Sequence, residues 1–277
     1  MARTSFAKSV FARKLAPPLM INSTRHPRSL SRFFVALIAA LVCVSAQAQT
    51  NFYNNITGFS GSAYAQGGAA SNGSFFVTRT VADDLTFAPG SAGASITGFQ
   101  FSVANFNTSA ASVRPNIVFY SDNGAGGGPG TVLAAIAFNA VNVGAGSVSL
   151  FTFNPATTLF TVPSSGRIWA GIFFDNGGSS TATSAQMNNF GQGLFNPPTV
   201  GSSTDIFFQS SATGNTSSNP AGGFSNFGGN PPANFGWRLF GNAAVAAPET
   251  GSTALLLLLG CVGVMAAHRR LRSASAR

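Results

Sequence analysis

Two aspartates each begin an Asp-Asn-Gly tripeptide, and they are the chain's clearest candidates for site chemistry. Asp122 follows the apolar stretch Ile117–Tyr120, and Asp175 follows Ile172–Phe174. Asn-Gly favours a tight turn, which accounts for both tripeptides without any ligand. Carboxylates beside loop carbonyls are also ligands that Ca²⁺ prefers. Asp122 and Asp175 are therefore the candidates for a calcium site, and calcium is the one cofactor that the sequence suggests.

A glycosidase would need the same two carboxylates. Hydrolysis of a glycosidic bond uses two carboxyl groups, about 5.5 Å apart for retention or about 6.5–9.5 Å apart for inversion. Residues 49–247 contain five aspartates and no glutamate. Asp83 and Asp84 are adjacent, so on a strand we expect them to point to opposite faces and not to act together. A hydrolytic pair would therefore require the loops of Asp122 and Asp175 to converge.

Residues 49–247 lack the side chains that most catalysts use. They contain no lysine, histidine or cysteine, because His26, His268, Cys43 and Cys261 all lie nearer the two ends of the chain. Ser-His-Asp and Cys-His catalysis are therefore excluded within this segment, as are histidine-ligated metals and lysine Schiff bases. We expect a protein that is not an enzyme and has no catalytic residue.

The net charge of +9 comes from the ends of the chain. Seven of the 15 Lys and Arg residues precede Ala48, and four follow Ala267. Residues 49–247 hold four arginines and five aspartates, which is a net charge of 4 − 5 = −1. Binding to nucleic acid requires a basic patch on the folded domain, so we expect no nucleic-acid partner. So few charges, with most of the 27 Phe in this segment, suit a protein fixed in a matrix.

Short apolar stretches separated by turn residues run through residues 49–247. Apolar and polar side chains alternate in several of these stretches, as in half-buried strands. Strands are expected over Ser74–Val81, Ala82–Phe87, Ser95–Phe106, Val113–Tyr120, Thr131–Phe138, Ser147–Phe153, Leu159–Val162, Gly166–Asp175, Asp205–Ser210 and Gly236–Asn242, with one more in Gln49–Gly73. Gly177–Val200 and Ser211–Ala233 are expected to be long loops, and no helix of useful length is expected. The pattern predicts an all-β fold, an antiparallel β-sandwich of jelly-roll type.

Aromatic side chains could form a sugar-binding surface if they were exposed. Trp169 and Trp237 both lie in expected strands, and Trp169 shares a strand face with Phe173. That arrangement favours packing in the core over a binding role. The remaining candidates for an exposed platform are Tyr53, Tyr64 and Tyr120.

Residues 1–48 have the organisation of an export signal peptide. A basic segment leads into twelve apolar residues, Phe33–Val44, and these are followed by Ala46-Gln47-Ala48, a small-x-small cleavage pattern. We expect a signal helix, export through the Sec translocon and cleavage after Ala48. Met20 is an alternative start, which would leave a signal of 48 − 19 = 29 residues.

Residues 248–277 combine a polar motif, an apolar run and a basic end. Pro248-Glu249-Thr250 comes first, residues 253–267 carry no charge, and Arg269, Arg270 and Arg272 lie in the basic end, 268–277. A membrane-spanning helix needs about 20 apolar residues, and long arginine stems can extend a shorter one. We expect a transmembrane helix over 253–267, with the arginines on the cytoplasmic side and residues 49–247 outside.

This order of features resembles the PEP-CTERM sorting signal of Gram-negative bacteria. Pro248 and Glu249 match the first two positions of that family's Pro-Glu-Pro motif, and Thr250 departs from the third. The resemblance implies recognition and cleavage of the tail by an exosortase, a membrane protease. Residues 247–251 also differ by one residue from the Leu-Pro-x-Thr-Gly motif of Gram-positive sortases. A buried C-terminal core helix is a further alternative.

The ends and the middle of the chain together predict an exported, surface-sorted protein. We expect a structural or interaction protein of the extracellular polysaccharide matrix, anchored transiently in the inner membrane until an exosortase-type protease processes its tail. The alternative is a carbohydrate-binding module on the same scaffold, with polysaccharide as its partner. A glycosidase using paired aspartates is the third hypothesis.

Overall fold

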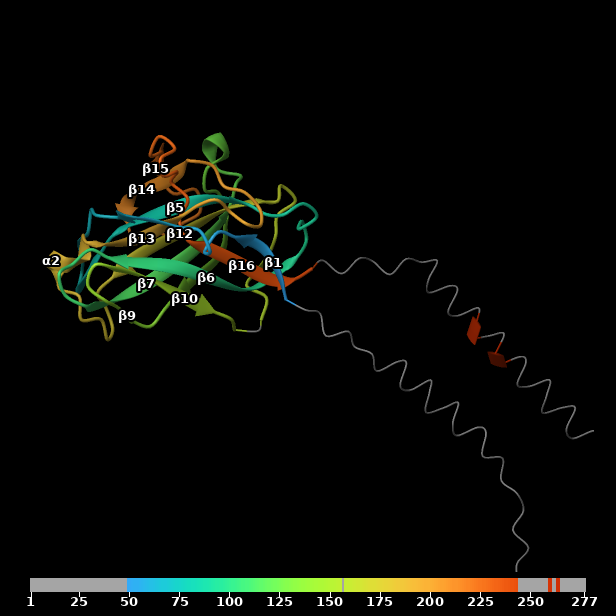
Figure 1. Ribbon diagram of the computed structural model, residues 1–277, viewed down its shortest axis with the longest axis horizontal. Coiled ribbons are helices and arrows are strands. Elements are labelled where there is room, and N and C mark those ends of the chain that lie inside the picture. Colours follow the sequence, from blue (N-terminus) through green and yellow to red (C-terminus); the bar gives the residue numbers. More distant parts are fainter. Residues whose placement is uncertain (1–48, 156, 244–258, 261–262, 265–277) are drawn as a thin grey trace, which may run out of the picture. The chain divides into compact units, whose positions relative to one another are not determined.

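The structure is a computed structural model that describes residues 49–155, 157–243, 259–260 and 263–264. These residues form a mostly β fold with two antiparallel sheets, one of which curls into a half-barrel (Figure 1). The expected antiparallel, β-rich architecture of the central segment is confirmed. The expected signal helix, 1–48, lies outside the described residues, as does most of the expected transmembrane helix, 253–267.

The first sheet is built around one long central strand, β6. Its strand order, within the described residues, is β1 (Thr50–Asn54), β16 (Trp237–Asn242), β6 (Ser95–Asn105), β13 (Phe190–Phe195) and β2 (Phe59–Ala65). Two further strands also pair with β6, namely β10 (Ser147–Phe153) and β11 (Phe160–Thr161).

The second sheet is built around β12 (Arg167–Asp175). Its order is β15 (Gly222–Ser225), β14 (Phe207–Thr213), β5 (Arg79–Thr86), β12, β4 (Phe75–Val77) and β3 (Ala70–Asn72). Strand β7 (Ala111–Ser121) also pairs with β12. Strands β8 (Val132–Ala137) and β9 (Val141–Val143) pair in turn with β7. A short 3₁₀ turn, η1 (Ala125–Gly127), follows β7.

Strand β12 shows why the sequence forms these sheets. Ile168, Ala170, Ile172 and Phe174 lie in the main core, and the alternate residues Trp169 and Phe173 lie in a second apolar cluster. Successive side chains of a strand point to opposite faces, so β12 is apolar on both faces and both are covered. The main core contains Phe99, Phe101, Phe119 and Trp237, whose rings pack at centroid distances of 5.1–6.3 Å.

The two segments expected to be long loops contain regular structure, which corrects that expectation. Gly177–Val200 includes a one-turn helix, α2 (Ser184–Met187), and strand β13, while Ser211–Ala233 includes β15. Strand β13 alternates glycine with larger residues, and a Cβ on Gly191 would collide with the Tyr64 carbonyl of β2. Gly191 interrupts the apolar alternation that would have predicted a strand, but it is needed because the backbones of β13 and β2 approach closely there.

Two other expectations about strands were wrong. Gln49–Gly73 holds three strands, β1, β2 and β3, where one was expected. The break expected between Val81 and Ala82 lies instead at Thr78, between β4 and β5. Val77 pairs with Asp175 and Val81 pairs with Ile172. The β4–β5 side therefore advances four residues while β12 advances three, so the β4–β5 side has one extra residue, as in a β-bulge. The Thr78 hydroxyl accepts a hydrogen bond from the Phe174 N–H at 2.9 Å and occupies this irregular position.

The first and last strands of the described domain pair with each other. In the β1–β16 ladder Thr50 lies opposite Gly241, and Asn54 lies opposite Arg238 (Figure 1). The chain therefore enters and leaves the folded domain at the same end of one antiparallel ladder.

Within the part of the chain that the structure describes, none of the helices has the length and apolar character needed to cross a bilayer. Leu259, Gly260, Gly263 and Val264 are helical and exposed.

Candidate functional site

The two Asp-Asn-Gly aspartates lie at opposite ends of the β7–β12 ladder. Ser121, which precedes Asp122, pairs with Ile168, whereas Asp175 pairs with Arg114. Ile168 and Asp175 are seven residues apart on β12, which is about 23 Å along a strand. The structure therefore does not bring Asp122 and Asp175 together, and the convergence that a hydrolytic pair would need is not found.

Asp175 is buried, and other side chains already occupy its carboxylate. Arg114 Nε donates to Oδ1 at 2.7 Å, and Asn116 Nδ2 donates to Oδ2 at 2.7 Å. The Gly177 N–H adds a third hydrogen bond to Oδ1 at 2.8 Å, which is the turn that Asp-Asn-Gly predicts. Asp122, at the other end, accepts a hydrogen bond from the Ser165 hydroxyl at 2.9 Å. Among the described residues no three His, Cys, Asp or Glu side chains group as a metal site.

We therefore expect chelation of calcium to leave the melting temperature unchanged. The reason is that the guanidinium of Arg114 already supplies the positive charge beside Asp175. The measurement is a thermal melt of the purified protein with and without EGTA. A fall of several degrees that added Ca²⁺ reverses would contradict this expectation and would restore calcium as a cofactor.

Asp83 and Asp84 share a hydrogen-bond partner although they lie on opposite faces of β5, as expected: Asp83 is opposite Ala170 of the main core and Asp84 is opposite Trp169 of the second cluster. Both are buried on β5, and the Ser203 hydroxyl lies 3.2 Å from Asp83 Oδ1 and 3.4 Å from Asp84 Oδ1. The cause is an irregular edge. Ser202 pairs with Thr86 and Phe207 pairs with Asp83, so four intervening residues lie opposite only two. Because of the extra residues, the chain around Ser203 bulges, and the Ser203 hydroxyl lies within hydrogen-bonding distance of both carboxylates.

The remaining partners of the two carboxylates differ. Asp83 Oδ2 accepts the Phe235 N–H at 2.8 Å. Asp84 Oδ1 accepts the N–H and hydroxyl of Thr204 at 3.1 and 3.0 Å, and Asp84 Oδ2 pairs with Arg167 Nη2 at 3.0 Å. The cation thus lies beside Asp84, and the pKa of Asp83 is raised well above its usual value, first by burial and then by the charge of Asp84.

Hydrogen counting around Ser203 agrees with a protonated Asp83. The Ser203 hydroxyl lies within 3.4 Å of four acceptors, but it has a single hydrogen to donate. These acceptors are Asp83 Oδ1, Asp84 Oδ1, the Thr204 carbonyl and Asn234 Oδ1. A proton on Asp83 would supply one missing donor. We call Asp83, Asp84, Arg167 and Ser203 the aspartate cluster.

The tryptophans and tyrosines do not form an exposed platform. Trp169 and Trp237 are buried, which confirms the expectation of core packing, and Tyr53 and Tyr120 are buried as well. Trp169 Nε1 donates to the Gly127 carbonyl at 2.9 Å, and the Tyr120 hydroxyl donates to the Asn215 carbonyl at 3.1 Å. Burial raises the pKa of both tyrosines, with the Asp83 charge as a second cause for Tyr53.

Tyr64 is half-buried, and its ring packs on Phe207 and Phe227 at 5.3 Å. Burial raises the pKa of Tyr64, while the Gln209 side chain and the Arg79 charge oppose that shift. Within the described residues, therefore, no tryptophan or tyrosine is exposed.

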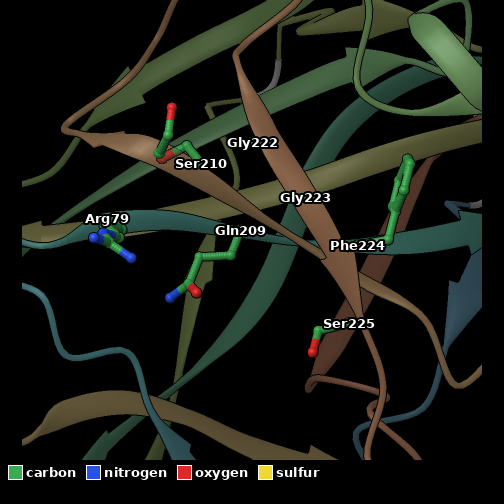
Figure 2. A pocket seen from close by; sticks show the side chains of 8 residues that line it. Arg79, Gln209, Ser210, Gly222, Gly223, Phe224 and Ser225 are labelled. Atoms are coloured by element: carbon green, nitrogen blue, oxygen red, sulfur yellow. The ribbon is translucent and has the colours of Figure 1, made fainter.

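An open groove of about 530 Å³ lies beside the β14–β15 hairpin (Figure 2). Its lining comprises Arg79, Gln209, Ser210, Ser211, Gly222, Gly223, Phe224 and Ser225. Arg79 begins β5, Gln209 lies on β14, and Gly222–Ser225 is the edge strand β15. We call this hollow the Arg79 groove. The sequence interpretation missed it because β15 fell in an expected loop, and a single arginine in an expected strand predicts no partner.

The predicted sorting and processing residues all lie outside the described residues. They are Ala46 and Ala48 of the signal cleavage site, Pro248, Glu249 and Thr250 of the sorting motif, and Arg269, Arg270 and Arg272 of the basic end.

Comparison of the chain with protein-family models, with curated proteins and with solved structures finds no match.

Proposed function

We propose that this chain is an exported structural or interaction protein of the extracellular polysaccharide matrix, sorted by its C-terminal tail. In this proposal a signal peptide, 1–48, directs export through the Sec translocon. A transmembrane helix, 253–267, then holds the protein in the inner membrane, and an exosortase-type protease processes it for the cell surface. The order of motif, apolar run and basic end in residues 248–277 is the observation that carries the proposal.

The central domain supports a role without catalysis. Its lack of lysine, histidine and cysteine removes the commonest nucleophiles and bases. The carboxylates of Asp84 and Asp175 are each held by an arginine, and Asp83 is held by the Ser203 hydroxyl and the Phe235 N–H. We infer that these aspartates stabilise the fold, which we propose to be a jelly-roll-like sandwich.

Replacing Glu249 with alanine is expected to block processing of the tail in a host that has an exosortase. Wild-type protein recovered from the cell surface should end near the motif, whereas the variant should stay in the membrane with Arg277 intact. Intact-mass spectrometry of the surface and membrane fractions measures both. Thr250→Pro is the matched control, because it completes the Pro-Glu-Pro motif and should still be processed. A surface form of the wild type that keeps its arginine end would contradict the proposal.

Carbohydrate binding is the second candidate function. A set of exposed, coplanar aromatic rings would have favoured this function. The exposed phenylalanines of the described residues, Phe59, Phe106 and Phe224, do not suggest such a set, because they belong to separate parts of the chain. The observation that favours it is of another kind, namely an exposed arginine in an open polar groove.

A further inference from the structure

Arg79 differs from the other arginines of the described residues in having no acceptor. Arg114 and Arg167 pair with Asp175 and Asp84, and Arg238 donates to the amide oxygens of Asn51 and Gln100. Arg79 is exposed, and among the residues that the structure describes its guanidinium makes no hydrogen bond or ion pair. It therefore presents an uncompensated positive charge to the groove.

The Arg79 side chain has a defined place in the fold. Its stem lies against Gly68, where a built Cβ would sit 3.1 Å from Nε and 3.2 Å from Cδ. Gly68 itself has a φ of +60°, a conformation that favours glycine. The β2–β3 connection thus leaves room for the arginine stem. This packing restricts where the guanidinium can lie, so less side-chain entropy is lost when it binds an anion.

Polar groups line the Arg79 groove together with the guanidinium. Gln209 Nε2 makes a long hydrogen bond of 3.4 Å to the Gln66 carbonyl, while Ser225 is exposed. Figure 2 shows Arg79, Gln209 and Ser225 extending to the same side of the hairpin, with Phe224 extending to the other side. The face that carries the charge is therefore polar, while Phe224 lines the groove from its other side.

Strand β15 makes this face shallow and accessible. Gly223 lies opposite Gln209 in the β14–β15 ladder, and a Cβ built on Gly223 would meet no atom within 4 Å. Strand β15 is also the edge of the second sheet within the described residues. The groove is thus open to solvent, with a guanidinium, an amide and a hydroxyl along it.

We propose that the Arg79 groove binds a carboxylate-bearing polysaccharide, with Arg79 holding a uronate carboxylate and Gln209 and Ser225 binding neighbouring hydroxyls. A guanidinium matches a carboxylate in charge and in planar geometry. A peptide strand added to β15 would need pockets for alternate side chains to be recognised, and Gly223 and Ser225 provide none. The inference deepens the proposed function, because export to a polysaccharide matrix supplies the ligand.

The test uses the full chain in mild detergent, with polygalacturonate as the probe. Wild type should bind, and Arg79→Gln should bind roughly tenfold more weakly, as expected for loss of a charge-assisted contact. Arg238→Gln is the matched control, because it removes the same charge from another arginine of the domain. The basic ends of the chain are the same in both variants, so their attraction for a polyanion cancels in the comparison.

A second variant tests the groove without changing its charge. Gly223→Val should fit an edge strand, since nothing occupies the space around Cβ, but it narrows the groove and should also weaken binding. Matching thermal melts would show that both variants are folded. Neutral dextran should not bind.

Three results would overturn the inference: no binding by wild type, equal losses in Arg79→Gln and Arg238→Gln, or equally tight, Arg79-dependent binding of poly-glutamate. The last would assign the groove to an acidic peptide. None of these results bears on tail processing, so failure of the groove and failure of the sorting proposal are distinguishable.

Discussion

Replacing Arg167 with methionine should lower the free energy of unfolding by about 3 kcal/mol. The change leaves Asp84, which is 1% exposed, without the cation that pairs with its Oδ2. Breaking a buried ion pair from one side costs about 3–5 kcal/mol, because the remaining charge stays buried and unpaired. We take the low end of that range because 32% of the Arg167 side chain is exposed. Urea unfolding at neutral pH measures the loss.

Two further variants separate the charge effect from lost packing on Trp169, over which the guanidinium lies at 5.4 Å. Adding Asp84→Asn to Arg167→Met should recover most of the stability, because no unpaired charge then remains. Arg238→Met should cost only about 1 kcal/mol, since it removes hydrogen bonds to neutral amides. Equal losses in Arg167→Met and Arg238→Met, without recovery in the double variant, would show that Asp84 does not depend on the cation.

Asparagine at position 83 should remove a pH dependence of stability. The pKa of Asp83 is raised in the folded state above its usual value of 3.8, so the folded protein binds more protons than the unfolded chain between these two values. The stability that Asp83 contributes is therefore fully present below pH 3.8 and is lost as the pH rises through the folded-state pKa. Each unit by which the pKa is raised corresponds to about 1.4 kcal/mol.

The measurement is the difference in unfolding free energy between Asp83→Asn and wild type across pH 4 to 8, because the other groups titrate alike in both. Asparagine resembles a protonated carboxyl and can donate to Ser203, so the difference should move in favour of the variant as the pH rises. A flat difference for Asp83→Asn would show that Asp83 is ionised in the fold.

The regular strands could be predicted from the sequence because apolar and polar residues alternate where one face of a strand is buried and the other is not. Ser95–Phe106 and Gly166–Asp175 match β6 and β12 to within a residue, and both have an apolar face in the main core. Strands β13 and β15 could not be predicted in this way. Their glycines carry no side chain that could show a face, and at Gly191 the reason for glycine is a neighbouring backbone that is distant in sequence.

The aspartate cluster and the Arg79 groove could not be predicted from the sequence, for a different reason. Alternation along β5 places Asp83 and Asp84 on opposite faces, but the Ser203 hydroxyl that they share comes from a neighbouring chain that is irregular between Ser202 and Phe207. Four arginines and five aspartates are visible in residues 49–247, but only the fold assigns partners. Among the described residues, Asp84 and Asp175 pair with Arg167 and Arg114, whereas Arg79 pairs with no carboxylate.

The pairing of β1 with β16 determines how the domain responds to mechanical tension. Thr50 and Gly241 are opposite each other at the end where the chain enters and leaves, so a pull between the two exits acts across the ladder. Its hydrogen bonds would then break one pair at a time, as in unzipping, at a lower force than shearing needs. A domain stretched from both ends would yield first at this ladder. A domain anchored by one end alone would carry no load between these two exits.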